Sequence, residues 1–234
     1  GSSSEKRLCI YVGAAAGGVL KSKDNGTTFR AVFDKEKEHS VGAMALDPSH
    51  ADSVLWVGTG ESNCRNSVSI GGGLYKTSDG GETWKCVGLE KVERIAKIAI
   101  VASSPNTVFV AGLGALWSDS PERGLYKTTD GGVSFKRVLY VNEKTGCADV
   151  AVDPGNPQIV YASMWQFRRQ AYSFNSGGPG SGLYKSTDGG TTWKKLEKTI
   201  PHGDLGRILI AIAPSKPNVV YRSEEHTSEL QSRQ

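Results

Sequence analysis

The chain has 234 residues, of which 38% are hydrophobic and 29 are glycines, and its formal net charge is +4. This length can bury a sizeable core, and many glycines with little helical periodicity favour an all-β fold with tight turns. Lysine and arginine are scattered along the chain, which excludes the basic patch of a nucleic-acid-binding protein, and no apolar run is long enough for membrane insertion.

Four related phrases follow one another along the chain. They read GVLKSKDNGTTF (18–29), GLYKTSDGGETW (73–84), GLYKTTDGGVSF (124–135) and GLYKSTDGGTTW (182–193). Between their aspartates recurs a second phrase, in which two apolar strands flank a turn that contains proline; its copies are residues 44–58, 98–112, 150–163 and 208–221. Each repeat is therefore predicted to have four short antiparallel strands, a pattern typical of a β-propeller blade.

In chain order, the sequence predicts an incomplete blade at about 8–33, complete blades at about 41–88, 95–140 and 147–196, and two strands of a fifth blade at 207–221. We therefore expect an all-β fold, a β-propeller fragment of about four blades plus part of a fifth, over residues 1–221. A solenoid of β-hairpins is the structural alternative. Because propellers usually close with four to eight blades, we expect the remaining blades of a longer chain to be partners of this piece.

Residues 222–234 break the repeat. The stretch RSEEHTSELQS (222–232) corresponds to the in-frame translation of a common sequencing-adapter oligonucleotide. We therefore expect 222–234 to be a non-native tail, and we leave its histidine and glutamates out of every candidate site.

The first phrase contains the pattern Ser/Thr-x-Asp-x-Gly-x-Thr/Ser-Trp/Phe, which resembles the Asp-box, or bacterial neuraminidase repeat. It lies on the hairpin between the third and fourth strands of each repeat. Its carboxylate can accept hydrogen bonds from its own turn, its glycine can adopt a positive φ, and its aromatic side chain can fill the gap between sheets. A calcium loop is excluded because the acidic ligands at alternate positions are missing. We expect a structural role for the box residues, which are Asp24, Asp79, Asp130, Asp188, Gly26, Gly81, Gly132, Gly190, Phe29, Trp84, Phe135 and Trp193.

Loop length varies at one place in the repeat. The end of the second strand and the box aspartate are 12, 22, 19 and 26 residues apart, whereas the third-strand glycine always precedes that aspartate by six. We call the variable loop, between the second and third strands, the rim loop. In an up-and-down sheet the rim loops and the loops between blades share one end, the rim face, and the boxes lie at the other, the box face. Variable loops on a rigid scaffold often carry binding sites.

The rim loops cover residues 61–71, 113–123 and 164–181. Their candidate ligand-binding residues are Glu61, Arg65, Trp117, Asp119, Trp165, Arg168, Arg169 and Tyr172, and the loops between blades add His39, Arg94, Glu143, His202 and Asp204. Aromatic rings beside arginines and carboxylates suit a sugar or an extended peptide. They equally suit packing within a long loop, and Trp165 and Phe167 could simply anchor theirs. Glu61, Asp119 and Asp204 are the weak candidates for the two carboxylates of a glycoside hydrolase.

The stretches VGTGESNCRNSVSIGGGLYKTSDGGETW, RGLYKTTDGG, GPGSGLYKSTDGGTTW and HGDLGRI resemble a family of large bacterial propeller proteins with a sortilin-like N-terminal region, also described as Asp-box or glycosyl-hydrolase-like proteins. The resemblance implies export to the periplasm or outside the cell, although the N-terminal residues lack the apolar core of a signal peptide. Related propellers include sialidases, xyloglucanases and sortilin receptors.

Three functions therefore stay open: binding of a glycan, peptide or protein on the rim face, glycoside hydrolysis of the sialidase or xyloglucanase type, and a structural or assembly role. A sialidase site needs an arginine cluster, and here the candidate arginines are bunched in sequence rather than spread across blades. No cofactor is implied. The four cysteines, Cys9, Cys64, Cys86 and Cys147, lack metal-ligand spacing, so we expect no metal site.

Overall fold

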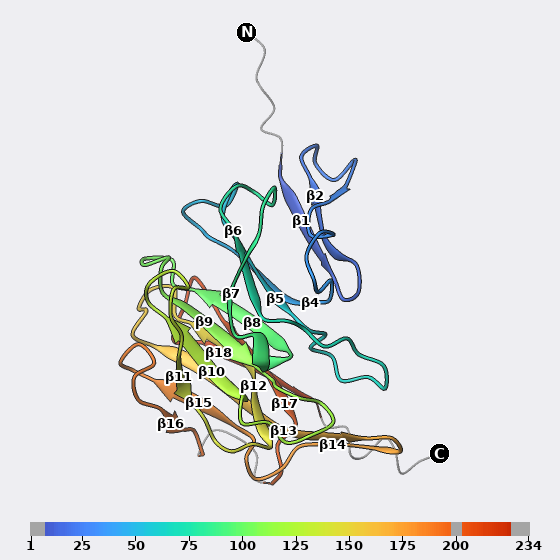
Figure 1. The fold of residues 1–234 in the computed structure, drawn as a ribbon. Coiled ribbons are helices and arrows are strands. Elements are labelled where there is room, and N and C mark those ends of the chain that lie inside the picture. The colour runs from blue at the N-terminus through green and yellow to red at the C-terminus, as the bar shows by residue number, and fades with distance from the viewer. Residues whose placement is uncertain (1–7, 198–202, 226–234) are drawn as a thin grey trace.

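The computed structural model describes residues 8–197 and 203–225. Apart from one 3-10 turn, η1 (Glu90–Val92), the regular elements in these residues are all strands, which confirms the predicted all-β class. The strands form five antiparallel sheets that follow one another along the chain (Figure 1). No helix in the described part of the chain is long and apolar enough to cross a membrane.

The sheets have the strand order that a series of propeller blades requires. The first sheet contains β1 (Ile10–Ala14), β2 (Gly18–Ser22) and β3 (Arg30–Ala31). The second contains β4 (Val41–Leu46), β5 (Leu55–Thr59), β6 (Leu74–Thr77) and β7 (Lys85–Gly88), and the third contains β8 (Ile95–Ile100), β9 (Val108–Gly112), β10 (Gly124–Thr128) and β11 (Lys136–Leu139). The fourth contains β12 (Thr145–Val152), β13 (Val160–Gln170), β15 (Gly182–Ser186) and β16 (Lys194–Lys195), and the fifth β17 (Arg207–Ile212) and β18 (Val220–Glu225).

The fourth sheet differs from the prediction in its rim loop. The sequence places residues 164–181 in a loop, but β13 continues to Gln170 and pairs with the additional strand β14 (Ser173–Ser176). Aromatic and other strand-favouring side chains in MWQF extend the strand, because Trp165 and Phe167 both find buried positions. The result is a two-stranded ribbon that projects from this sheet at the lower right of Figure 1.

The core lies between successive sheets. One apolar cluster joins Val19 and Phe33 of the first blade to Leu55 and Tyr75 of the second, and two further clusters join the second to the third and the third to the fourth. Close approach of the sheets requires small residues. A Cβ built on Gly58 would lie 2.4 Å from the Ile95 side chain, so β5 packs directly against the next blade.

The two ends of the sheets carry the predicted loops. On the box face, each complete blade joins its Asp-box to the turn between its own first two strands, as in the bond from Gly80 N to Ser53 O (2.8 Å). The rim loop of the second blade and the β13–β14 ribbon extend to the other side of the molecule, at the right of Figure 1.

The expected tail is described only in part. Residues 222–225 continue β18, where Arg222 pairs with Ile210 of β17. The remainder, 226–234, lies outside the described residues, as does the candidate rim residue His202.

Candidate functional site

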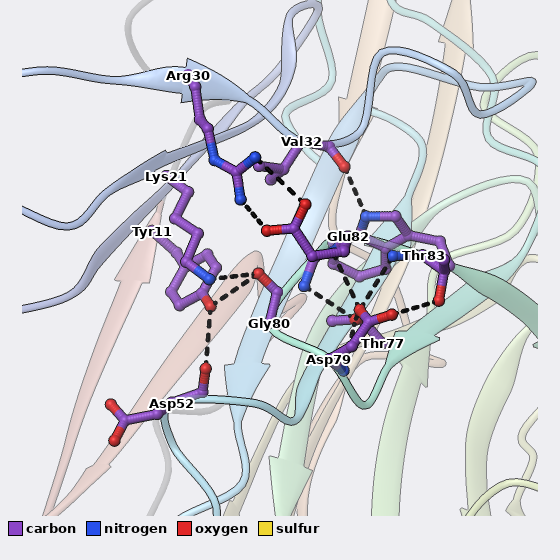
Figure 2. A network of polar contacts seen from close by, with 12 residues as sticks. Tyr11, Lys21, Arg30, Val32, Asp52, Thr77, Asp79, Gly80, Glu82 and Thr83 are labelled. Carbon is purple, nitrogen blue, oxygen red and sulfur yellow. Dashed lines mark hydrogen bonds and ion pairs between the residues drawn. The ribbon is translucent and has the colours of Figure 1, made fainter.

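Each Asp-box is a closed hydrogen-bond network. In the second blade, Asp79 Oδ1 accepts hydrogen bonds from the Thr77 hydroxyl (2.7 Å) and from the Thr83 backbone N–H (2.9 Å), while Oδ2 accepts one from the Thr83 hydroxyl (2.5 Å) (Figure 2). Gly81, at φ 91°, donates its N–H to the Thr77 hydroxyl. The same pattern surrounds the other three box aspartates, Asp24, Asp130 and Asp188.

These donors stabilise the carboxylate form. Hydrogen bonds lower the pKa of Asp24 to about 2, and the bond from the Thr28 hydroxyl has the largest effect. The equivalent bonds hold the pKa of the other three box aspartates further below the ordinary value. The oxygens of each box carboxylate are occupied by donors of its own turn, an arrangement that fits the structural role expected for the box.

A lysine in the third strand of each of the first three blades binds the box of the next blade. Lys76 Nζ donates to Gly131 O, in the box of the next blade (3.0 Å), and lies 4.6 Å from the centroid of the Trp56 ring. Lys21 and Lys127 make the same bond to the next box, at 2.5 and 2.7 Å. Burial lowers the pKa of all three ammonium groups. We call this contact the lysine seam; sequence reasoning missed it, although the lysine occurs in every GLYK or GVLK phrase.

The aromatic side chains of the boxes also pack between neighbouring blades. Trp84 packs into the cluster between the first and second blades, and its indole N–H donates to Val32 O of the preceding blade (2.6 Å). Phe135 and Trp193 pack into the next two clusters. Phe29, in the first box, is 45% exposed and is the exception.

On the rim face, loops of several blades pack over one another. Leu113 and Leu116 of the third blade form an apolar cluster with Trp165 and Phe167 of β13, and Cys64 of the second blade packs against it. Arg207 at the start of β17 donates to Ser62 O (3.3 Å) and Asn63 Oδ1 (3.1 Å), so the rim loop of the second blade reaches the fifth sheet. The centre of the rim face is therefore filled by side chains.

A stack of rings and guanidinium groups runs through this packing. Trp165 and Phe167 stack with centroids 4.4 Å apart. The Arg123 guanidinium lies 4.1 Å from the Phe167 ring, and that of Arg207 lies 5.5 Å from the Trp165 ring. Trp165 is 2% exposed, so it anchors its loop and is not open to a ligand.

Arginines concentrate around Cys64. Burial raises the pKa of the Cys64 thiol to about 11, opposed by the charges of four arginines from other loops and strands: Arg207, Arg94, Arg123 and Arg169. The Nε atoms of these four are buried without a hydrogen-bond partner among the described residues. The arginine cluster, which the sequence did not reveal, therefore spans several blades. Arg123 is the last residue of its rim loop and Arg207 the first residue of β17, and neither was among the predicted site residues.

An open cleft lies beside the packed centre, between the rim loop of the third blade and the β13–β14 ribbon. It has a volume of about 310 Å³ and is lined by Asp119, Lys144, Gln166, Phe167, Arg168, Gln170, Asn175 and Gly177. Asp119 and Arg168 form an ion pair at 2.9 Å, with two fifths of each side chain exposed. We call this the rim cleft.

The other predicted rim residues fall into two groups. Buried ones serve packing: Glu61 is 5% exposed and pairs with Arg65, and Arg94 is 1% exposed and donates to Glu93 Oε2 (2.9 Å). Trp117 is 47% exposed and Tyr172, near the tip of the ribbon, is 88% exposed. The exposed group also includes His39, Glu143 and Asp204. Arg169 belongs to neither group: it is half-buried, and its guanidinium lies over the Phe174 ring.

Comparison with known proteins supports this architecture. A family model described as the BNR/Asp-box repeat matches residues 184–195, the hairpin of the fourth box. An ancestral GH74 enzyme of known structure superposes with a TM-score of 0.68 at 18% identity, over 93% of this chain and 27% of that one. The chain has the β-propeller fold and contains a BNR/Asp-box hairpin.

Among curated proteins, this propeller is similar to xyloglucanases. Xyloglucanase Xgh74A of Acetivibrio thermocellus is 24% identical over 216 residues, which cover 80% of this chain and 23% of that protein. The oligoxyloglucan-reducing end-specific xyloglucanase of Emericella nidulans is 25% identical over 236 residues, or 84% of this chain and 27% of that protein. The chain thus spans about a quarter of the length of these relatives.

Proposed function

We propose that this propeller module binds a polysaccharide on its rim face, at the rim cleft. The observation that carries the proposal is the cleft itself: a hollow of about 310 Å³ lined by amides and charged groups, on the face where loop length varies. Amide and charged side chains can exchange several hydrogen bonds with sugar hydroxyls.

Exposed aromatic rings support the same ligand. Trp117 belongs to the loop that carries Asp119, and Tyr172 lies at the tip of the ribbon that carries Arg168. Leaving large rings in water is unfavourable, and flat aromatic faces suit the apolar faces of sugar rings. The similarity to proteins named xyloglucanases adds to the case for a glycan rather than a peptide.

Isothermal titration of the 234-residue chain with polysaccharides, xyloglucan first, tests the proposal. We expect Trp117→Ala and Tyr172→Ala each to weaken binding about tenfold, the loss of roughly 1.4 kcal/mol of contact. Phe29→Ala removes a similarly exposed ring from the box face and serves as the matched control. Binding that survives both rim substitutions, or that fails for every polysaccharide while a protein partner binds, would contradict the proposal.

Glycoside hydrolysis is the second candidate, favoured by the names of the relatives. Of the carboxylates proposed from sequence, Glu61 and Asp119 each pair with an arginine, and Asp204 is exposed. Release of reducing ends from xyloglucan, lost in both Glu61→Gln and Asp119→Asn with binding retained, would establish an enzyme. Binding without hydrolysis is the result we expect of this chain.

The proposed location is the periplasm or the outside of the cell, where polysaccharides are accessible. Fractionation of the source cells with an antibody against the chain tests this, and a cytoplasmic signal would contradict it.

A further inference from the structure

The rim cleft has more basic than acidic groups. Its lining contains two cations, Lys144 and Arg168, and one carboxylate, Asp119. Arg168 uses only Nη1 in its bond to Asp119, although a guanidinium has five N–H donors. Within residues 8–197 and 203–225, no hydrogen bond or ion pair holds the exposed Lys144 ammonium group. Both cations therefore have donors to spare for a ligand.

Neutral hydrogen-bonding groups lie beside these cations. The lining also includes the amides of Gln166, Gln170 and Asn175. Gln166 already accepts a bond from Gly180 N at 2.9 Å, which fixes its orientation, and Gln170 accepts one from the Ser173 hydroxyl at 3.0 Å. Amides of fixed orientation suit hydroxyl groups, whereas the cations suit an anion.

The packed centre next to the cleft adds positive charge. Arg123 is fully buried and stacks on Phe167, whose side chain also lines the cleft. The Arg94 side chain is 1% exposed, and the Nε atoms of both arginines have no partner among the described residues. Glu93, the acid that pairs with Arg94, balances one of these charges. Buried cations with few acids around them create a positive potential that attracts anions.

We propose that the rim cleft recognises an acidic sugar: the carboxylate of a uronic acid residue binds Arg168 and Lys144, and its hydroxyls bind the neighbouring amides. This inference rests on the proposed function and names the class of polysaccharide. An arginine and a lysine can bind one carboxylate through charge-assisted hydrogen bonds, while Asp119 keeps Arg168 in place.

The test compares two oligosaccharides of equal length, a galacturonate oligomer and a neutral xyloglucan fragment, by isothermal titration with the 234-residue chain. We expect the acidic oligomer to bind at least about tenfold more tightly, and its affinity to fall as salt rises. Arg168→Gln and Lys144→Gln should each weaken binding of the acidic oligomer about tenfold and weaken binding of the neutral fragment by a clearly smaller factor. Lys23→Gln, an exposed lysine of the first box, is the matched control for charge.

The outcomes separate the two proposals. Equal or tighter binding of the neutral fragment overturns the acidic-sugar inference and leaves polysaccharide binding intact. Failure of both oligosaccharides overturns the acidic-sugar inference, and failure of every polysaccharide overturns both proposals. A poly-glutamate peptide that binds more tightly than the galacturonate oligomer also overturns the inference, because it shows a preference for acidic peptides. Thermal unfolding of each variant confirms that the fold is retained.

Discussion

The box aspartates and Asp149 are hydrogen-bonded carboxylates in different surroundings. The box carboxylates lie at the surface and accept several N–H and O–H bonds, which lower their pKa. Asp149 in β12 is 4% exposed and accepts bonds from Val150 N (2.9 Å) and Ile210 N (2.8 Å), the latter in the next blade. Burial outweighs these bonds and raises the pKa of Asp149. The two kinds of aspartate therefore respond oppositely to acid.

Asp130→Asn should lower the melting temperature by a few degrees at pH 7, because an amide cannot accept all the bonds that the carboxylate accepts. A lowered folded-state pKa gives stability that is present above the unfolded value of about 4 and is lost as pH falls through the folded value. The difference in melting temperature between Asp130→Asn and wild type should therefore shrink as the pH falls from 4 to 2. Melting curves across this range, with Asp52→Asn as an exposed control, check it; a constant difference would refute it.

Asp149→Asn should change the pH dependence in the opposite sense. A raised folded-state pKa means that wild-type stability from this residue is complete below about pH 4 and declines as pH rises toward the folded value. The Asp149→Asn variant lacks this pH-dependent contribution to stability, because its amide does not titrate. Urea unfolding between pH 4 and pH 7 should show that wild type gains more stability on acidification than the variant does. Identical slopes in both proteins would contradict the assignment of a buried, raised-pKa carboxylate.

At the scale of an element, the third strand of each of the first three blades carries a contact to the next blade. Lys76→Met keeps most of the apolar stem but removes the bond to Gly131 O and the charge over Trp56. Leaving that carbonyl without its partner should cost about 1–3 kcal/mol in the free energy of unfolding. Lys85→Met, an exposed lysine of β7 in the same blade, should cost less than 0.5 kcal/mol by comparison, roughly the range of surface substitutions.

Urea denaturation measures both changes. Equal effects of Lys76→Met and Lys85→Met would show that the seam contributes nothing beyond an ordinary surface lysine. A larger loss of unfolding free energy in Lys76→Met, with unchanged secondary structure by circular dichroism, would show that the contact between blades stabilises the fold.

The strands and boxes could be predicted from sequence because each depends on local patterns. Apolar alternation marks a strand, and the Asp-x-Gly spacing marks the hairpin, where Gly81 needs its positive φ. The sequence left open whether Trp165 binds a ligand or anchors its loop, since that depends on how Phe167 and Arg207 pack against its ring. The same holds for the rim cleft, whose walls come from two blades that local sequence does not relate.

At the scale of the molecule, the rim loop of the second blade joins distant parts of the chain. Arg207 of β17 donates to Asn63 Oδ1 and Ser62 O, more than 140 residues away in sequence. We expect Asn63→Ala and Arg207→Met to show a coupling of about 0.5–1 kcal/mol in a double-mutant cycle on unfolding. The pair Arg207→Met and Asn25→Ala, whose sites lie in different sheets, should show none. A zero coupling for Asn63 would mean that the loop does not hold the fifth sheet.

The lysine seam also gives the arc of blades a direction. Each of the first three blades offers an ammonium group to its successor, and the second, third and fourth blades each offer a glycine carbonyl to their predecessor. A repeat copied in tandem would meet a matching donor on one flank and a matching acceptor on the other. Duplication or loss of a whole unit in the gene would leave every junction chemically the same, so blade number can change in evolution while the rim loops diverge independently.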